Sequence, residues 1–379
     1  MKQDTLLAQA GGRRDPATGA IAMPLHLSAA YQHPALGQST GFDYARTSSP
    51  TRLALEEVLA ALEGGARATA FASGLAAIDA VIRLFQPGDV IVATEDLYGG
   101  TFRLFEKFAK PAGIVFTYVD TSNTAPVAEA LESPAVRGLF VEIPTNPLLK
   151  VADLAALGGL IRGKNIRFIV DNTFLTGAAC RPLDFGADIA LYSATKYLGG
   201  HNDLVAGIVV SRTAETGADA AFIQNAAGAG LGPFESWLLL RSLKTLPLRL
   251  KKHADNASAV AQFLQSHPKV RNLRWPGLPS DPGHAVLARQ SGSFGGMISF
   301  EVASRQAVER LLASVRVFMF AESLGAPESL VTYPLVQTHA DIDQETRARI
   351  GLTDCLVRLS IGLEDPADLI ADLACALDA

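Results

Sequence analysis

Lys196 stands in a polar segment, 193–203 (SATKYLGGHND), that directly follows the apolar run 187–192. Such a run is typical of a buried strand. A lysine at the end of a buried strand is partly desolvated, which favours its neutral amine and allows it to form a Schiff base. The hydroxyls of Ser193 and Thr195 on either side can bind a phosphate. Considered alone, Lys196 would be interpreted as an exposed lysine just past a strand end, since exposed lysines are the rule.

A carboxylate, Asp171, ends a second apolar run at 166–171 (IRFIVD). Neighbouring parallel strands deliver their carboxyl ends to the same edge of a sheet, so Asp171 and Lys196 should face one crevice. Pyridoxal phosphate (PLP) requires a lysine that holds its aldehyde and a carboxylate that keeps its ring nitrogen protonated. The pair therefore predicts a PLP site.

The segment 192–200, together with Asp171-Asn172-Thr173, resembles the PLP signature of the Cys/Met-metabolism, or trans-sulfuration, family. The resemblance extends over nearly the whole chain, from 24–28 (PLHLS) to 363–365 (LED). The family contains cystathionine γ-synthases, γ-lyases and β-lyases, O-acetylhomoserine sulfhydrylases and methionine γ-lyases. The resemblance implies the fold-type I architecture of PLP-dependent transferases and a homotetramer built from dimers that share active sites.

A second signature is the turn 73–75 (SGL), which joins the predicted strand 68–72 to a helix. A strand-to-helix turn with glycine presents free backbone N–H groups and a positive helix end to a phosphate. The turn resembles the family's Ser-Gly-Met turn. The implied cofactor-binding residues in the body of the chain are Ser73, Gly74, Leu75, Tyr98, Asn146, Asp171, Thr173, Ser193, Thr195 and Lys196, and of these Lys196, Tyr98 and Asp171 are implied to be catalytic.

Residues 1–50 are rich in glycine, proline and small polar residues and predict an extended arm. The segment 41–52 (GFDYARTSSPTR) resembles the family's Tyr-x-Arg…Asn-Pro-Thr segment, which implies that Tyr44 and Arg46 bind the cofactor phosphate of the neighbouring subunit. A planar guanidinium suits a phosphate because it donates two parallel hydrogen bonds. Thr47 stands where some family members carry a second arginine, so one anchor for an O-succinyl carboxylate is lost.

The predicted substrate-binding residues lie mostly in the last third of the chain. Arg358, on the apolar strand 356–360 (LVRLS), matches the family arginine that binds the substrate α-carboxylate. The segment 321–325 (AESLG) resembles the loop that lines the substrate side, and the glutamate at this position is typical of γ-acting members. The implied substrate-binding residues are Arg358, Ser323, Glu322, Arg103 and Asn146, although Arg103 could equally be a solvated helix residue.

The elements that must position these residues alternate between strands and helices along the chain. Seven strands are predicted at 68–72, 90–93, 114–118, 138–142, 166–171, 187–192 and 205–210. The alternation predicts an α/β fold with a seven-stranded, mostly parallel sheet and its ligand at the carboxyl edge. We expect an N-terminal arm at 1–50, a PLP-binding domain at 51–245 and a smaller α+β C-terminal domain at 246–379, with a long helical stretch at 234–263 between the last two.

Composition limits the other function classes. The net charge of −5 and the lack of an extended basic cluster argue against nucleic acid as a partner. The charged N-terminus and the lack of any apolar run of spanning length argue against a membrane and favour a cytoplasmic protein. Three scattered cysteines, Cys180, Cys355 and Cys375, and seven histidines without ligand spacing predict neither a disulfide framework nor a metal site.

We expect γ-replacement on an O-acylated homoserine, with the O-acetyl ester favoured and the O-succinyl ester as an alternative. Cysteine is the second small amino-acid substrate and cystathionine the product. The segments 200–204 (GHNDL) and 332–339 (TYPLVQTH) look most like bacterial cystathionine γ-synthases. Cystathionine γ-lyase and β-lyase activities use the same residues and remain alternatives. A non-catalytic PLP-binding regulator should have lost Lys196 or Arg358, and a nicotinamide dehydrogenase should show G-x-G-x-x-G after its first strand.

Overall fold

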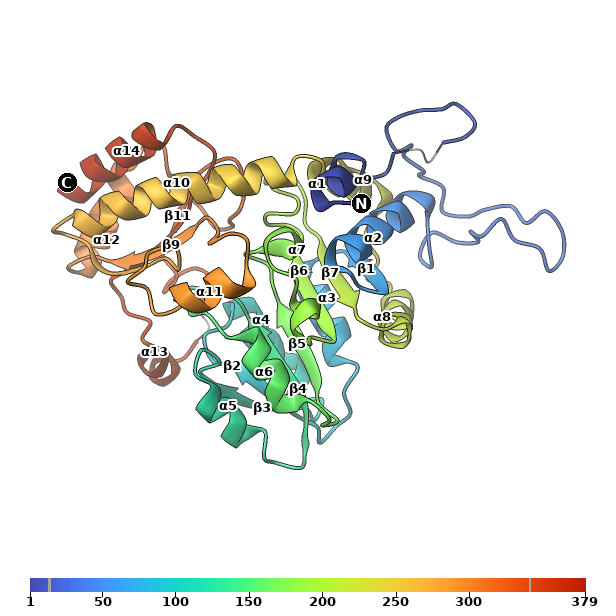
Figure 1. Cartoon of the computed structure of the whole chain (residues 1–379), viewed down its shortest axis with the longest axis horizontal. Helices are drawn as coiled ribbons and strands as arrows, with labels where there is room; N and C mark the ends of the chain where they lie inside the picture. Colours follow the sequence, from blue (N-terminus) through green and yellow to red (C-terminus); the bar gives the residue numbers. More distant parts are fainter. Residues whose placement is uncertain (13–14, 341) are drawn as a thin grey trace.

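The larger sheet has seven strands, as predicted. The computed structural model describes residues 1–12, 15–340 and 342–379. The strands are β1 (Arg67–Phe71), β2 (Val90–Thr94), β3 (Val115–Val119), β4 (Val136–Glu142), β5 (Arg167–Asp171), β6 (Ile189–Ser193) and β7 (Gly207–Ser211), in the order β1-β7-β6-β5-β4-β2-β3. Strand β7 runs antiparallel to β1 and β6, and the other neighbours pair in parallel. The mostly parallel sheet is thus confirmed (Figure 1).

Helices cover both faces of this sheet. Helices α2 (Pro50–Glu63) and α6 (Leu154–Ile161) share one core with Phe168 and Val170 of β5, whereas α3 (Gly74–Ile82) and α8 (Ala214–Ala227) share another with Ile169. This alternation follows from the opposite directions of successive side chains in a strand. Because both faces are covered, the strands read as nearly continuous apolar runs.

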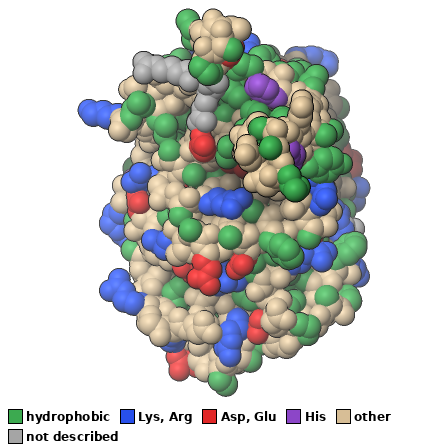
Figure 2. Space-filling model, turned by 90° about the vertical axis from the view of Figure 1, so that its right-hand side faces the viewer, with side chains coloured by type: hydrophobic (Ala, Val, Ile, Leu, Met, Phe, Trp, Pro, Cys, Tyr) green, Lys and Arg blue, Asp and Glu red, His purple; other side chains and the backbone are tan. Residues whose placement is uncertain are grey.

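The N-terminal arm differs from the prediction at its beginning. Residues Gln3–Ala8 form helix α1, whose Leu7 is buried in the same core as α2. Beyond it, most side chains up to residue 48 are at least partly exposed, and the chain loops away from the body (Figure 1). On the face that carries the arm, acidic and basic side chains are scattered among apolar and uncharged ones (Figure 2).

A second, five-stranded sheet lies in the C-terminal third. Its strands are β10 (Met319–Phe320), β11 (Leu330–Thr332), β12 (Leu356–Ser360), β9 (Met297–Glu301) and β8 (Arg271–Arg274), in that order. Helices α10 (Leu246–Ser266), α12 (Arg305–Ser314) and α14 (Pro366–Asp378) contribute to the core of this sheet. The smaller α+β unit is confirmed as a second sheet with its helices, and the domain boundaries at residues 50 and 245 stay a prediction.

The predicted helical stretch 234–263 is helical but forms two helices, α9 (Pro233–Leu243) and α10, with a break at Lys244 and Thr245. Pro247 stands in the first turn of α10, where its missing N–H costs no helical hydrogen bond, and this position marks a new helix start. The remaining α-helices of the described residues are α4 (Gly99–Leu104), α5 (Thr124–Ala130), α7 (Thr176–Ala179), α11 (His284–Gln290) and α13 (Gln344–Ile350). In the part of the chain that the structure describes, no helix is both long and apolar enough to cross a membrane.

Candidate active site

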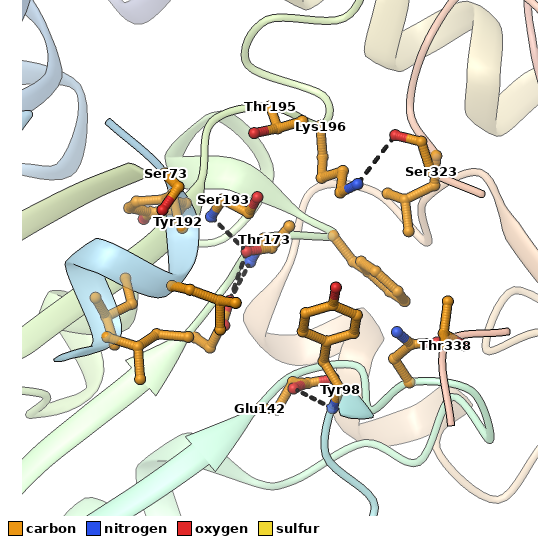
Figure 3. Close-up of a pocket in the computed structure, with 18 of the residues that line it drawn as sticks. Ser73, Tyr98, Glu142, Thr173, Tyr192, Ser193, Thr195, Lys196, Ser323 and Thr338 are labelled. Atoms are coloured by element: carbon orange, nitrogen blue, oxygen red, sulfur yellow. Dashed lines mark hydrogen bonds between the residues drawn. The ribbon is translucent and has the colours of Figure 1, made fainter. Parts of the chain in front are cut away.

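Lys196 lies just beyond the carboxyl end of β6, and its side chain points toward the C-terminal part of the chain (Figure 3). Its Nζ donates to Ser323 Oγ at 2.9 Å. Burial and the nearby positive charge of Arg358 lower the pKa of Lys196 to about 8, although the charge of Glu322 acts in the opposite direction. Near neutral pH, a substantial fraction of this amine is therefore in the nucleophilic form.

Asp171 ends β5, beside β6, and is buried. Its Oδ1 accepts from the Thr173 backbone N at 3.1 Å and from Thr173 Oγ1 at 2.6 Å. Burial raises the pKa of Asp171 to about 6, and the two hydrogen bonds from Thr173 partly oppose this. Thr173 Oγ1 also accepts from the Ser193 backbone N at 2.8 Å, which ties the ends of the two strands together. The predicted pairing of Asp171 and Lys196 at one sheet edge is observed.

The turn 73–75 forms the N-terminus of α3. Ser73 is the N-cap residue, and its Oγ accepts from the Ala76 backbone N at 3.0 Å. A Cβ atom on Gly74 would lie 2.9 Å from the Cβ and Oγ atoms of Ser193, so only glycine allows this close approach of the turn to the end of β6. The free N–H groups and the positive dipole of α3 thus stand beside the hydroxyls of Ser193 and Thr195.

Tyr98 and Glu142 form the opposite side of the site (Figure 3). Tyr98 is the residue before α4, and its backbone N donates to Glu142 Oε2 at 3.0 Å. Glu142 ends β4 and is buried; burial and then the charge of Asp171 raise the pKa of this carboxyl well above its ordinary value. A Glu142 that stays neutral avoids repulsion with Asp171.

Arg358 reaches the same site from β12 and is only 1% exposed. Its Nη1 donates to Asn146 Oδ1 at 2.7 Å, and its Nη2 donates to the Ser323 backbone O at 3.2 Å and to Thr332 Oγ1 at 3.1 Å. Among the described residues, its buried Nε has no hydrogen-bond partner. Burial lowers the pKa of Arg358 to about 10, so it remains a cation at neutral pH that can bind a carboxylate.

Comparisons with known proteins decide the family. Residues 4–378 match the profile described as "Cys/Met metabolism PLP-dependent enzyme". The chain belongs to this family. It is 47% identical over 376 residues to a cystathionine gamma-synthase of Mycobacterium tuberculosis (98% of this chain, 96% of the relative) and 46% identical over 378 residues to a cystathionine gamma-lyase of Bacillus subtilis (100% of both). A cystathionine beta-lyase of Lactococcus lactis is 44% identical over 374 residues (99% and 98%).

Solved structures agree with this assignment. A cystathionine gamma synthase from Xanthomonas oryzae pv. oryzae in complex with cystathionine superimposes with a TM-score of 0.98 at 41% identity, over 100% of this chain and 98% of that one. The fold-type I architecture, the membership of the Cys/Met-metabolism family and PLP as the cofactor are thereby confirmed. The names of the relatives are divided between synthase and lyases.

The residues of this Cys/Met-metabolism enzyme fit PLP. The close approach at Gly74 leaves the helix N-terminus open to an anion, as a phosphate requires. Asp171 is a buried carboxylate that forms no ion pair with the described residues, so a protonated ring nitrogen would supply its missing cation. Lys196 supplies the amine. All three border a cavity of about 290 Å³.

The cavity is lined by most of the predicted site residues: Ser73, Gly74, Leu75, Tyr98, Asn146, Asp171, Thr173, Ser193, Thr195, Lys196, Glu322, Ser323 and Arg358. Three others do not line it. Arg103 is exposed on α4. Tyr44 and Arg46 lie on the arm, where Arg46 Nη1 donates to the backbone O of Asn225 at 2.7 Å and to its Oδ1 at 3.0 Å. Their predicted place, at the site of a neighbouring subunit, stays a prediction.

Glu142 and Thr338 line the cavity but were not predicted. For Glu142 a signal was present, because the predicted strand 138–142 ends in a carboxylate at the same edge as Asp171. Thr338 follows no strand and is brought to the cavity by the path of the loop after β11. The segment 332–339 was singled out for its likeness to the family, but its residue types do not indicate that Thr338 contacts the cavity.

Proposed function

We propose that this enzyme is a cystathionine γ-synthase, in which the sulfur of cysteine displaces acetate from Cγ of O-acetylhomoserine. The observation that carries the PLP-dependent amino-acid chemistry of this proposal, which synthases and lyases share, is the convergence of the Lys196 amine, the Asp171 carboxylate and the Arg358 guanidinium on one cavity of about 290 Å³. When bound, PLP supplies an electron sink for the charge that remains on the substrate when a proton is removed.

Arg358 is the proposed anchor for the α-carboxylate. Its guanidinium is held by Asn146 and Thr332 on one side of the cavity, so that its orientation is fixed before the substrate arrives. A rigid, two-pronged cation orients the amino acid, and this orientation selects the bond that breaks. Asn146 Oδ1 accepts from Arg358, which leaves its Nδ2 as the group that can donate to the cofactor.

Lys196 is the proposed base for the Cα proton and then for a Cβ proton, whose removal allows the γ-substituent to leave. Its lowered pKa of about 8 suits a group that takes up and returns protons near neutral pH. Ser323 Oγ, 2.9 Å from Nζ, orients the amine. Asp171 keeps the proton on the cofactor ring nitrogen, and the phenol of Tyr98 covers the cavity from the opposite side (Figure 3).

The charges in the cavity support the acetyl rather than the succinyl ester. Among the described lining residues, Lys196 and Arg358 are the two cations, and each already has a role. A succinyl group would bring a second carboxylate into a cavity that already contains Glu322, with no further cation among the described lining residues of this chain to bind it. An acetyl group has no such charge.

We further propose a cytoplasmic homotetramer whose arms complete neighbouring sites. The arm exposes apolar side chains, among them Ile21 at 86% and Leu27 at 68%, and Tyr44 is half exposed, as expected of a segment that another subunit covers. The thiols of Cys180, Cys355 and Cys375 are unpaired, as is usual in a reducing compartment. If Arg46 binds the neighbour's phosphate, Arg46→Ala weakens cofactor retention during dialysis, and unchanged retention would contradict this contact.

The deciding experiment supplies purified holoenzyme with O-acetylhomoserine or O-succinylhomoserine plus cysteine, and separately with cystathionine alone, and identifies the products by mass spectrometry. We expect cystathionine and acetate from O-acetylhomoserine with cysteine, and no turnover by Lys196→Ala. Faster cleavage of cystathionine than synthesis would refute the proposal. Cysteine with 2-oxobutanoate would then identify a γ-lyase, and homocysteine with pyruvate a β-lyase.

A further inference from the structure

Helix α10 carries three polar side chains that are almost completely buried. Arg249 is 5% exposed, His253 is 0% exposed and Asn256 is 1% exposed. Their spacing of four and three residues places them on one face of the helix. None of the three lines the catalytic cavity among the described residues. In Figure 1, α10 is the long yellow helix that extends from near α1 toward α12 and α14 of the second sheet.

Arg249 holds the segment that follows Lys196. Its Nη1 donates to the backbone O of Tyr197 at 2.7 Å, and its Nη2 donates to the backbone O of Leu198 at 3.4 Å and of Ser242 at 3.1 Å. No carboxylate pairs with Arg249 within the described residues. Burial lowers its pKa to about 10, so it remains a cation, held by these backbone carbonyl groups and by Thr245 Oγ1, which accepts from Nε at 3.2 Å. Burying a charge in this way is costly, and packing alone does not require it.

His253 and Asn256 hold the segment that follows Arg358. His253 Nδ1 lies 2.6 Å from the backbone O of Ile361, and since a carbonyl only accepts, Nδ1–H is the donor. Burial lowers the pKa of His253 to about 4, so the ring is neutral at physiological pH. Asn256 Nδ2 donates to the backbone O of Gly362 at 3.0 Å and of Glu364 at 2.8 Å. Ile361 is the first residue after β12, the strand of Arg358.

Tyr197 joins the two sets of contacts. Its ring is perpendicular to that of His253, with centroids 5.2 Å apart, and it is fully buried. A Cβ atom on Gly325 would lie 2.8 Å from the Tyr197 backbone N, so the loop that carries Ser323 packs tightly against the residue after Lys196. The segments that follow Lys196 and Arg358 are therefore both held by side chains of α10.

We propose that Arg249, His253 and Asn256 form a clamp that sets the distance between the Lys196 amine and the Arg358 guanidinium, and that they act as positioning residues for proton removal. The inference rests on the base and anchor roles proposed above for those two residues. A misplacement of about 1 Å between a base and its proton can slow a reaction by about 100-fold. Because the clamp does not touch the cavity, its loss should slow the proton transfer more than it weakens substrate binding.

The test uses two variants that disrupt the clamp, His253→Ala and Arg249→Lys, and a rescue variant, His253→Asn, whose amide can still donate to Ile361. The control is Leu264→Ala. Leu264 is a fully buried residue of the same helix that packs in the core of the second sheet and makes none of the clamp contacts. In the holoenzymes, kcat per bound cofactor, KM, the thermal midpoint and the isotope effect with Cα-deuterated substrate are measured. In the cofactor-free proteins, the pH midpoint for acetylation of Lys196 is measured.

For His253→Ala and Arg249→Lys we expect kcat to fall about 10- to 100-fold with KM changed less than about threefold, a larger isotope effect, and a Lys196 midpoint above that of the parent. His253→Asn should recover most of the rate, and Leu264→Ala should lower only the thermal midpoint. If His253→Ala behaves like Leu264→Ala, the clamp is merely structural and the inference is wrong. Any substrate that the parent enzyme turns over can be used for these measurements. Turnover by Lys196→Ala would refute the proposed function rather than the clamp.

Discussion

The ionisation of Lys196 in the cofactor-free protein gives the most direct measure of the site. Burial together with Arg358 lowers the pKa of this amine from 10.5 to about 8. At pH 7, about a tenth of the Lys196 amines is then neutral, against about 0.03% for an ordinary lysine, an advantage of about 300-fold in nucleophile. The rate of acylation at Lys196 should rise about tenfold per pH unit up to pH 8 and then level off.

The assay is brief treatment of the cofactor-free protein with acetic anhydride at pH 6 to 11, followed by mass spectrometry of each lysine peptide. Lys150 is the internal control. Burial alone would lower its pKa, but its 2.8 Å hydrogen bond to Asp120, with the charges of Asp120 and Glu95, raises it above 10.5. We expect midpoints near 8 for Lys196 and above 10.5 for Lys150.

A variant that removes the charge of Glu322 tests the direction in which this residue shifts the pKa of Lys196. The negative charge of Glu322 raises the pKa of Lys196, so Glu322→Gln should move the midpoint below that of the parent. A parent midpoint at 10 or above would refute the account of Lys196 as a desolvated amine. A midpoint that moves upward in Glu322→Gln would show that Glu322 does not act on Lys196 through its charge.

Three further variants test the rest of the site. Burial raises the pKa of Asp171 from 3.8 to about 6, so the free energy of unfolding of the cofactor-free protein falls by about 3 kcal/mol as the pH rises through this range. In urea unfolding at pH 8, Asp171→Asn should regain up to this amount of stability. The same variant should lower the turnover of the holoenzyme. Gly74→Ala, whose Cβ would lie 2.9 Å from Ser193, should weaken PLP binding about tenfold or more by equilibrium titration. Arg358→Lys keeps the positive charge but loses the two parallel N–H donors of the guanidinium, so KM should rise about 10- to 100-fold in steady-state kinetics.

The sheet and its ligand edge could be predicted because they depend on local rules. Buried strands read as apolar runs, and parallel strands share an edge, so Asp171 and Lys196 could be placed together from their positions after two runs. The same rule applied to β4 would have found Glu142. Helix α2 was also predictable, since Pro50 and Gly64 mark its ends and the structure shows Ser49 as its N-cap and Gly64 as its C-cap.

Other parts of the site depend on contacts that no local pattern encodes. Ser323 Oγ reaches Lys196 Nζ across 127 residues, and Arg358 lies on a strand of the second sheet whose own pattern shows only that it is buried. Resemblance to the family, not periodicity, assigned roles to both. The clamp residue His253 lies within an ordinary amphipathic helix pattern, and its burial becomes visible only when α10 is packed against Tyr197 and the segment after β12. Helix α1 was missed because a helix of six residues is too short for its hydrophobic periodicity to be detected in the sequence.

Desolvation shifts the pKa values of Lys196 and Asp171 in opposite directions, and these shifts link the stability of the site to its chemistry. Burial lowers the pKa of Lys196 and raises that of Asp171, so both groups are pushed toward their neutral forms. For the lysine this is useful in itself, because the neutral amine is the reactive form. For the aspartate it is a cost, because a neutral acid cannot hold a proton on a ring nitrogen; a cationic ring bound by Asp171 would recover that cost. Cofactor binding should therefore stabilise the fold most above pH 6, where Asp171 is ionised.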